Sequence, residues 1–236
     1  MAPRLSRSRQ LATAARWPVG IALTSWRYMW RTVPMRRREI AGDAQADRPP
    51  ELPAGFRHDD LQTPADGVGP LFHRRYAVRV ADAELSPEDL VARMRENLDA
   101  FAPSEFASFQ RTTGDGPLAA GHEYIVRMPG PWDGPVRVVE AAETSFRLAT
   151  LAGHLEAGQI VFRAAADDDE LELSIESWAC SGDRLSNLLY THARMAKEIQ
   201  LHMWISFLER AIEHSGGRRS GPIEIETRRV DDHGDG

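Results

Sequence analysis

The chain has 236 residues and a mass of 26.4 kDa, which one globular domain with additional segments accounts for. Hydrophobic residues make up 42% and charged residues 27%, values that exclude a wholly disordered chain. The single cysteine, Cys180, excludes an internal disulfide framework and a multi-cysteine zinc or iron–sulfur site within one chain. It also favours a reducing compartment.

The net charge of −6 is unevenly distributed along the chain. Residues 1–40 carry nine arginines and one glutamate, a net charge of +8, so the remaining 196 residues carry −14. A basic arm is therefore joined to an acidic body. The acidic body would repel a nucleic acid, and the sequence has no zinc-finger or RNA-binding motif, so we expect no nucleic-acid partner. An anionic membrane surface, or the acidic body itself, fits the arm better.

The basic arm, residues 1–40, contains a predicted amphipathic helix that begins at Pro18 and ends before Pro34. Its apolar residues recur at spacings of three and four. The apolar stretch 17–30 has only 14 residues, which favours neither a spanning helix nor a secretion signal. The alternatives are a helix lying in a membrane interface, a helix covering the protein's own core or a second copy, and a targeting signal. The residues expected at the membrane interface are Trp26, Arg27, Trp30 and Arg31.

Two segments flank the predicted folded domain, which spans residues 71–214. Residues 41–70 hold five prolines and four glycines without periodicity, so they are predicted to be a Pro/Gly-rich linker with local extended structure. Residues 215–236 are rich in glycine, arginine and aspartate and are predicted to be a flexible tail.

Within 71–214 the pattern predicts a strand, a helix, six more strands and a long helix. The first strand, 71–80, alternates apolar and polar residues. A helix follows from Ser86, where a capping serine precedes a proline and two acidic residues, and it ends at Pro103. A helix of about thirty residues, 183–214, closes the domain. The six strand-like runs between the helices are separated by turns typical of an antiparallel meander: 105–111, 121–128, 135–140, 145–151, 158–165 and 170–178.

This order predicts an α+β, helix-grip fold. In it a curved antiparallel sheet of seven strands is wrapped on the long C-terminal helix, and the amphipathic N-terminal helix precedes them. Such a sheet cannot bury its concave face alone, so the helix is expected to lie across that face. A cavity between helix and sheet is then the default ligand site. The element order resembles the START and birch-pollen-allergen superfamily, also called SRPBCC.

Three stretches resemble one family more closely: residues 127–140, residues 146–163 and the strand end 175–178. The second stretch contains a Gly-His-x-Glu-x-Gly hairpin formed by Gly153, His154, Glu156 and Gly158. These stretches are similar to the domain-of-unknown-function family nineteen-ninety, found in bacteria and plants, over about residues 71–212. The resemblance implies a fold near the helix-grip class and no established activity.

Candidate ligand contacts come from the hairpin, one loop, two strands and the long helix. A histidine and a carboxylate two residues apart, His154 and Glu156, have the chemistry for proton transfer, although a polar turn explains them equally. Trp132 is either a lid or a core plug, and His192 is either a ligand contact or a buried core residue. The candidates are Tyr124, Val126, Met128, Trp132, His154, Glu156, Ile160, Phe162, His192, Met195, Ile199 and Met203.

No motif indicates a metal, a cofactor or a catalytic group. The eight histidines are dispersed without metal-ligand spacing. The sequence has no P-loop, no dinucleotide fingerprint and no Gly-x-Ser-x-Gly. We therefore expect no metal, no cofactor and no catalytic residues of a recognisable type.

Three functions remain. The first is a non-enzymatic binder of an apolar or amphipathic small molecule, cytoplasmic and held at the inner face of the membrane by its arm. The second is an enzyme of the polyketide-cyclase type on the same fold, which a buried histidine–carboxylate pair in a pocket would favour. The third is an interaction protein whose core is filled by its own side chains. The sequence leaves the oligomeric state open.

Overall fold

The computed structural model describes residues 33–56, 61–103, 107–127, 133–182 and 194–231, with the side chains of 133 and 194–199 excepted. The predicted helix of the basic arm lies outside these residues. In the described part, no helix combines the length and the apolar character that a membrane crossing requires.

The described chain forms one nine-stranded sheet, with strand order β1-β9-β2-β8-β7-β6-β5-β4-β3. Neighbouring strands are antiparallel except β1 and β9, which are parallel. The strands are β1 Met35–Ala41, β2 Val68–Ala81, β3 Ser108–Arg111, β4 Glu123–Arg127, β5 Asp133–Ala141, β6 Ser145–Thr150, β7 Glu156–Asp167, β8 Glu170–Ser181 and β9 Arg218–Val230. The helices are α2 Pro87–Glu96 and α4 Arg194–Ser215, with the short 3-10 turns η2 Pro64–Asp66 and η3 Leu98–Phe101.

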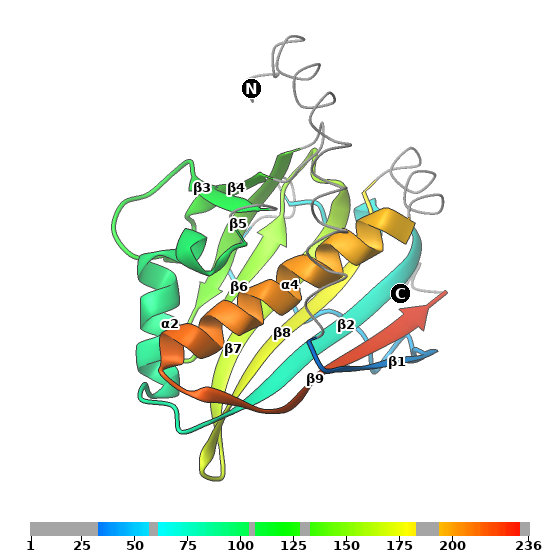
Figure 1. Cartoon of the computed structure of the whole chain (residues 1–236). Coiled ribbons are helices and arrows are strands. Elements are labelled where there is room, and N and C mark those ends of the chain that lie inside the picture. Colours follow the sequence, from blue (N-terminus) through cyan, green and yellow to red (C-terminus); the bar gives the residue numbers. More distant parts are fainter. Residues whose placement is uncertain (1–32, 57–60, 104–106, 128–132, 183–193, 232–236) are drawn as a thin grey trace, which may run out of the picture.

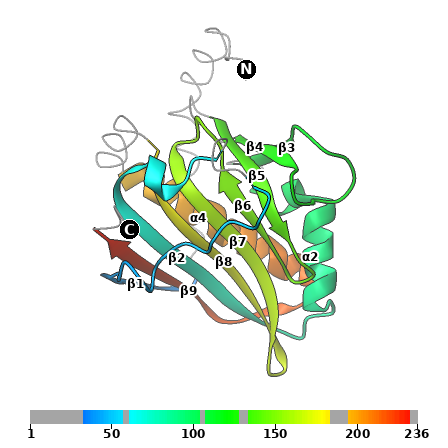
Figure 2. The ribbon, with the colours of Figure 1, turned by 180° about the vertical axis from the view of Figure 1, so that it is seen from behind.

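The curved sheet has two differently covered faces. Helix α4 lies diagonally across one of them, which we call the inner face (Figure 1). Residues 42–56 cross the opposite face, which we call the outer face (Figure 2). The predicted α+β arrangement, with a curved sheet wrapped on a long C-terminal helix, is confirmed.

Helix α2 begins as the sequence predicts. The Ser86 hydroxyl accepts a hydrogen bond from the backbone N–H of Asp89 at 3.1 Å, and Pro87 occupies the first helical position. Leu90, Val91 and Met94 form its buried face. The helix therefore closes one end of the core.

An aromatic cluster fills the space between α4 and the central strands. Phe146 and Phe162 stack with ring centroids 4.8 Å apart, and Phe207 of α4 lies 5.0 Å from Phe162. Trp204 of α4 meets Phe162 edge-on at 5.6 Å. These rings belong to one continuous buried core, so this part of the helix–sheet interface is packed with the protein's own side chains.

The prediction of seven antiparallel strands is wrong, because β1 and β9 extend the sheet to nine and make it mixed. Strand β9 lies within the predicted flexible tail, so the tail prediction is wrong for residues 218–230. Gly216, with φ of +76°, ends α4 and lets the chain turn back onto β2. Ile223 and Ile225 are buried in the core, and this burial stabilises the strand.

Part of the predicted linker, residues 41–70, packs against the sheet. Leu61 is buried with Val139 and Ala149 on the outer face, and Leu52 and Phe56 pack against them. Residues in 42–56 and Leu61 thus cover part of the outer face of the sheet, and they are not simply a spacer between the arm and the domain.

Candidate functional site

A buried polar cluster joins the inner face of the sheet to α4. The guanidinium Nη1 of Arg74 in β2 donates to the Gln200 Oε1 of α4 at 3.3 Å and lies 3.9 Å from the Glu156 Oε1 of β7. The Gln200 amide Nε2 donates to Glu156 Oε2 at 2.9 Å. The side chains of Arg74 and Glu156 are only 7% and 17% exposed. We call Arg74, Glu156 and Gln200 the interior polar cluster.

The position of Arg74 is unusual for a charged residue. It stands between Phe72 and Tyr76 on the inward-facing parity of β2, and its Cζ lies 4.6 Å from the Phe72 ring centroid. Burying a charge is unfavourable unless the charge is paired and hydrogen-bonded. Glu156 and Gln200 supply such partners for the Arg74 Nη1, so the cluster holds two opposite charges inside a largely apolar layer.

The predicted pair His154 and Glu156 is divided between two environments. The Nδ1 of His154 accepts a hydrogen bond from the backbone N–H of Glu156 at 2.9 Å, and its carbonyl accepts one from Gln62 Nε2 at 2.8 Å. Burial lowers the pKa of His154, and the nearby Glu156 charge only partly opposes this. The imidazole is therefore neutral near pH 7 and anchors the turn, while the Glu156 carboxylate reaches α4.

The other predicted ligand contacts occupy several places. Ile160 is partly buried against the main core. Tyr124, Val126, Phe162 and Met203 are buried within it. Met128, Trp132 and His192 lie outside the described residues, and so do the side chains of Met195 and Ile199. A ligand-contacting role for each of these residues stays a prediction.

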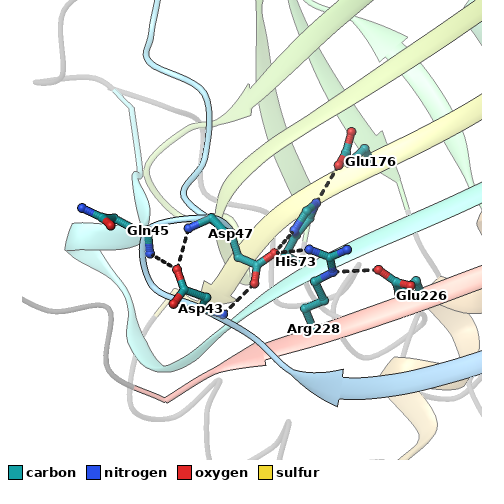
Figure 3. Close-up of polar contacts among 8 residues, drawn as sticks. Asp43, Gln45, Asp47, His73, Glu176, Glu226 and Arg228 are labelled. Carbon is teal, nitrogen blue, oxygen red and sulfur yellow. Dashed lines mark hydrogen bonds and ion pairs between the residues drawn. The ribbon is translucent and has the colours of Figure 1, made fainter.

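A second polar cluster lies on the outer face (Figure 3). The His73 Nδ1 of β2 lies 2.6 Å from the Asp47 Oδ1, and its Nε2 lies 2.6 Å from the Glu176 Oε1 of β8. Arg228 of β9 donates from Nη1 to the same Asp47 oxygen at 3.2 Å and from Nε to Glu226 at 2.7 Å. We call Asp47, His73, Glu176 and Arg228 the histidine clamp.

The segment that carries Asp47 is shaped to reach the clamp. Asp43 Oδ1 accepts from the backbone N–H groups of Gln45 and Ala46, which closes a tight turn. Gly42 precedes this turn, and a Cβ there would lie 2.6 Å from Val230 Cγ2 and 2.9 Å from Asp47 Oδ2. A side chain at position 42 would therefore push the turn away from β9.

The electrostatics of the clamp favour a charged histidine. Burial disfavours the imidazolium, but hydrogen bonds and charges from Glu176 and Asp47 outweigh burial, and the pKa of His73 is raised. The pKa of Asp47 is lowered, because hydrogen bonds from His73, Asp43 and Arg228 outweigh the opposing effect of its burial. Both ring nitrogens face carboxylates, so each donates a proton and no lone pair is free to act as a base. The His73 ring also stacks on Trp178 at 4.8 Å.

The described residues offer no evident metal or nucleophile chemistry. No group of three or more His, Cys, Asp or Glu side chains in the described part of the chain is arranged to hold a metal ion. The two carboxylates of the clamp contact opposite nitrogens of one ring and do not converge on a point. Burial, then the Glu156 charge, raises the pKa of Cys180 to about 11, so its thiol is protonated at neutral pH.

Sequence reasoning identified Glu156 but missed Arg74, Gln200 and the whole clamp. A usable signal existed for Arg74, because a charge on the apolar parity of an alternating strand indicates a buried polar site. The clamp had no local signal. Asp47 lies 26 positions from His73, and Arg228 lies in the segment predicted to be a flexible tail.

The described elements define an α+β protein in which a curved mixed sheet wraps around one long helix. Residues 41–209 match the family described as Domain of unknown function (DUF1990), and the chain belongs to this family. The predicted family is thereby confirmed, and the match also covers the 41–70 segment that the sequence resemblance left out. A search of curated proteins found no match.

Three solved structures are similar to this chain at low sequence identity. A hypothetical protein from Helicobacter pylori is 11% identical, with a TM-score of 0.45, covering 60% of this chain and 86% of its own. Norcoclaurine synthase from Thalictrum flavum, in complex with dopamine and hydroxybenzaldehyde, is 11% identical with a TM-score of 0.45, covering 70% and 95%. A major latex-like protein from Panax ginseng is 9% identical with a TM-score of 0.41, covering 61% and 97%.

Proposed function

We propose that this protein binds an amphipathic small molecule between the sheet and α4, with the polar part of the molecule at the interior polar cluster. The buried Arg74–Glu156 pair bridged by Gln200 carries this proposal. Interior charges are less favourable than a well-packed apolar core, so their presence at one end of the helix–sheet interface indicates a recognition site.

The two halves of the interface differ in a way that supports this location. Around Phe162 and Phe207 the interface is filled by aromatic side chains. Next to the cluster, the inward positions of the central strands carry the small residues Gly158, Ser177 and Ala179. Small side chains on the sheet leave more of the layer to a bound molecule. The ligand therefore belongs at the end of the sheet that carries Glu156.

The chemistry of the described groups favours a binder over a polyketide-cyclase-like enzyme. His154 is neutral and its Nδ1 is occupied by a backbone N–H. The buried histidine–carboxylate pair, His73 with Asp47, lies on the outer face, away from α4. Neither histidine is poised to move a proton on a molecule held at the cluster.

Substitution of Arg74 tests the proposal. Wild-type protein, purified without detergent, is expected to yield a specific co-purifying molecule in near-stoichiometric amount by mass spectrometry of its organic extract. In Arg74→Met the affinity should fall by at least about tenfold, and the retained amount with it, because a hydrogen bond to a charged group contributes about 1.5–3 kcal/mol. Arg75→Met is the matched control, since Arg75 lies on the outer face, is 41% exposed and pairs with Glu172.

The outcome separates binding from a purely structural role. Equal retention by Arg74→Met and Arg75→Met would show that the cluster only fixes α4 to the sheet. A wild-type extract indistinguishable from buffer and from an unrelated protein would contradict small-molecule binding and favour an interaction protein with a filled core.

We further propose that the basic arm holds the protein, in the cytoplasm, to the anionic inner face of a membrane. Arg27→Glu with Arg31→Glu in the full chain should reduce sedimentation with phosphatidylserine vesicles by about 30-fold, at about 1 kcal/mol for each arginine lost. Arg79→Glu with Arg163→Glu changes the net charge equally on the body and should leave sedimentation nearly unchanged. Equal losses in both double variants would attribute the binding to net charge and remove the arm from the proposal.

A further inference from the structure

We infer that the molecule bound at the interior polar cluster presents an uncharged oxygen acceptor, the carbonyl of a ketone, ester or amide, to the hydroxyl of Ser177 and the indole N–H of Trp204. This inference rests on the proposed function and specifies its ligand class. It comes from two polar atoms, one on the sheet and one on the helix, that the interior polar cluster does not use.

Both atoms are buried donors without a hydrogen-bond partner in the described part of the chain. Ser177 of β8 is 4% exposed and Trp204 of α4 is 6% exposed. Neither the Ser177 Oγ nor the Trp204 Nε1 has a hydrogen-bond partner among the residues that the structure describes. Leaving a buried donor unsatisfied costs about 1–3 kcal/mol, so two such donors in one layer call for an acceptor.

The register places the two donors in the same layer, beside the cluster. Ser177 pairs with Arg74 of β2 on one side and with Ile160 of β7 on the other. Trp204 lies against Phe162, the next inward-facing residue of β7 after Ile160. Gln200 is one helical turn before Trp204 on the same side of α4 and already contacts Arg74. Ser177 and its paired residues Arg74 and Ile160 therefore lie beneath the turn of α4 that joins Gln200 to Trp204.

The charge of the cluster selects an uncharged acceptor. Glu156 lies 3.9 Å from the Arg74 Nη1 and carries the opposite charge, so it offsets the positive charge that Arg74 would otherwise offer to a ligand. A ligand carboxylate or ammonium would add an uncompensated charge to a buried layer, which is strongly unfavourable. An indole N–H can only donate, so the matching ligand atom must accept. A carbonyl oxygen meets both requirements and can take a hydrogen bond from each donor.

Equilibrium dialysis with three ten-carbon probes tests the inference: 2-decanone, decanoate and 1-decene. Wild-type protein is expected to bind 2-decanone more tightly than decanoate. Trp204→Phe and Ser177→Ala should each weaken 2-decanone binding by about two- to tenfold and leave 1-decene binding within about twofold, as expected for one neutral hydrogen bond. Trp178→Phe is the matched control, because Trp178 is also a buried indole whose Nε1 lacks a partner in the described chain, but on the outer face.

The infrared frequency of the carbonyl stretch of bound 2-decanone provides a second measurement, because a hydrogen bond lowers it and a change in packing alone does not. This frequency should be lower in wild-type and Trp178→Phe protein than in Trp204→Phe. Tighter binding of decanoate, or an equal effect of Trp204→Phe on 2-decanone and 1-decene, overturns the inference. If a molecule co-purifies in an Arg74-dependent manner but has no uncharged acceptor, this inference alone fails. If nothing co-purifies and no probe binds, the proposed function fails with it.

Discussion

Replacement of Asp47 by asparagine is expected to lower the free energy of unfolding by about 3 kcal/mol at pH 6, the scale measured for breaking a buried ion pair. The Asp47 side chain is 2% exposed and contacts both the His73 imidazolium and Arg228. Asparagine keeps the shape but removes the charge, which leaves a buried cation with one carboxylate instead of two. Urea unfolding of wild-type and variant protein measures the difference.

The decrease in the free energy of unfolding caused by Asp47→Asn should become smaller as the pH rises. The pKa of His73 is raised above its ordinary value of 6.5, so its contribution is complete below 6.5 and disappears as the pH passes through the higher folded-state pKa. The pKa of Asp47 is lowered from 3.8, so its contribution is complete above 3.8 and is lost only in stronger acid. The clamp therefore stabilises the fold most between these two values, and the gap between wild-type and Asp47→Asn should be smaller at pH 9 than at pH 6.

A charged residue next to the clamp provides the control variant for Asp47→Asn. Glu226 lies beside the clamp as a partner of Arg228, and its side chain is 33% exposed, against 2% for Asp47. Glu226→Gln should change the stability by less than about 1 kcal/mol, as exposed ion pairs do. Equal effects of Asp47→Asn and Glu226→Gln, or a gap that widens toward pH 9, would contradict the assignment of a charged His73.

Replacement of Phe162 by alanine is expected to lower the free energy of unfolding by about 3–5 kcal/mol. The residue is 1% exposed and contacts Phe146, Phe207 and Trp204. Its loss would remove dispersion contacts on three sides and leave a cavity that a packed core fills only partly. Thermal or urea unfolding measures this loss directly.

Ile160→Ala provides the comparison on the same strand and the same face. Ile160 is only partly buried, so its truncation should cost clearly less than that of Phe162. The two substitutions together map where the packed core ends and the proposed binding region begins. A loss below about 1 kcal/mol for Phe162→Ala would show instead that this ring lines an open space, as the sequence-based list of ligand contacts supposed.

The central part of the fold could be predicted because its signals are local. Alternation defines β2, and the Ser86–Pro87 start defines α2. The strand β9 was missed, although Ile223 and Ile225 alternate with glutamates, because glycines and arginines dominate its surroundings. Its stability comes from pairing with β2, which lies about 150 positions earlier in the chain. A strand that is stabilised by pairing with a distant part of the chain is difficult to predict from the composition of its own segment.

The candidate site was harder to predict, for a related reason. Glu156 was identified because it follows a histidine in a glycine-flanked hairpin. Arg74 was passed over because the arginines at 75 and 79 made the strand look amphipathic. Its meaning depends on Gln200, 126 positions away, and no spacing rule connects the two. Contacts between polar side chains on different layers, such as Arg74 on the sheet and Gln200 on the helix, can be identified only once the three-dimensional arrangement of the layers is known.

The placement of β9 between β1 and β2 also bears on the order in which the chain matures. Among the described strands, β1 pairs only with β9, so residues 35–41 are synthesised early but have no strand partner until residues 218–230 leave the ribosome. Pairing over such a sequence separation is slow, because the whole intervening chain must be ordered before the contact forms. Strand β1 is therefore the last of these strands to join the sheet. It can pair with β9 only after translation has passed residue 230.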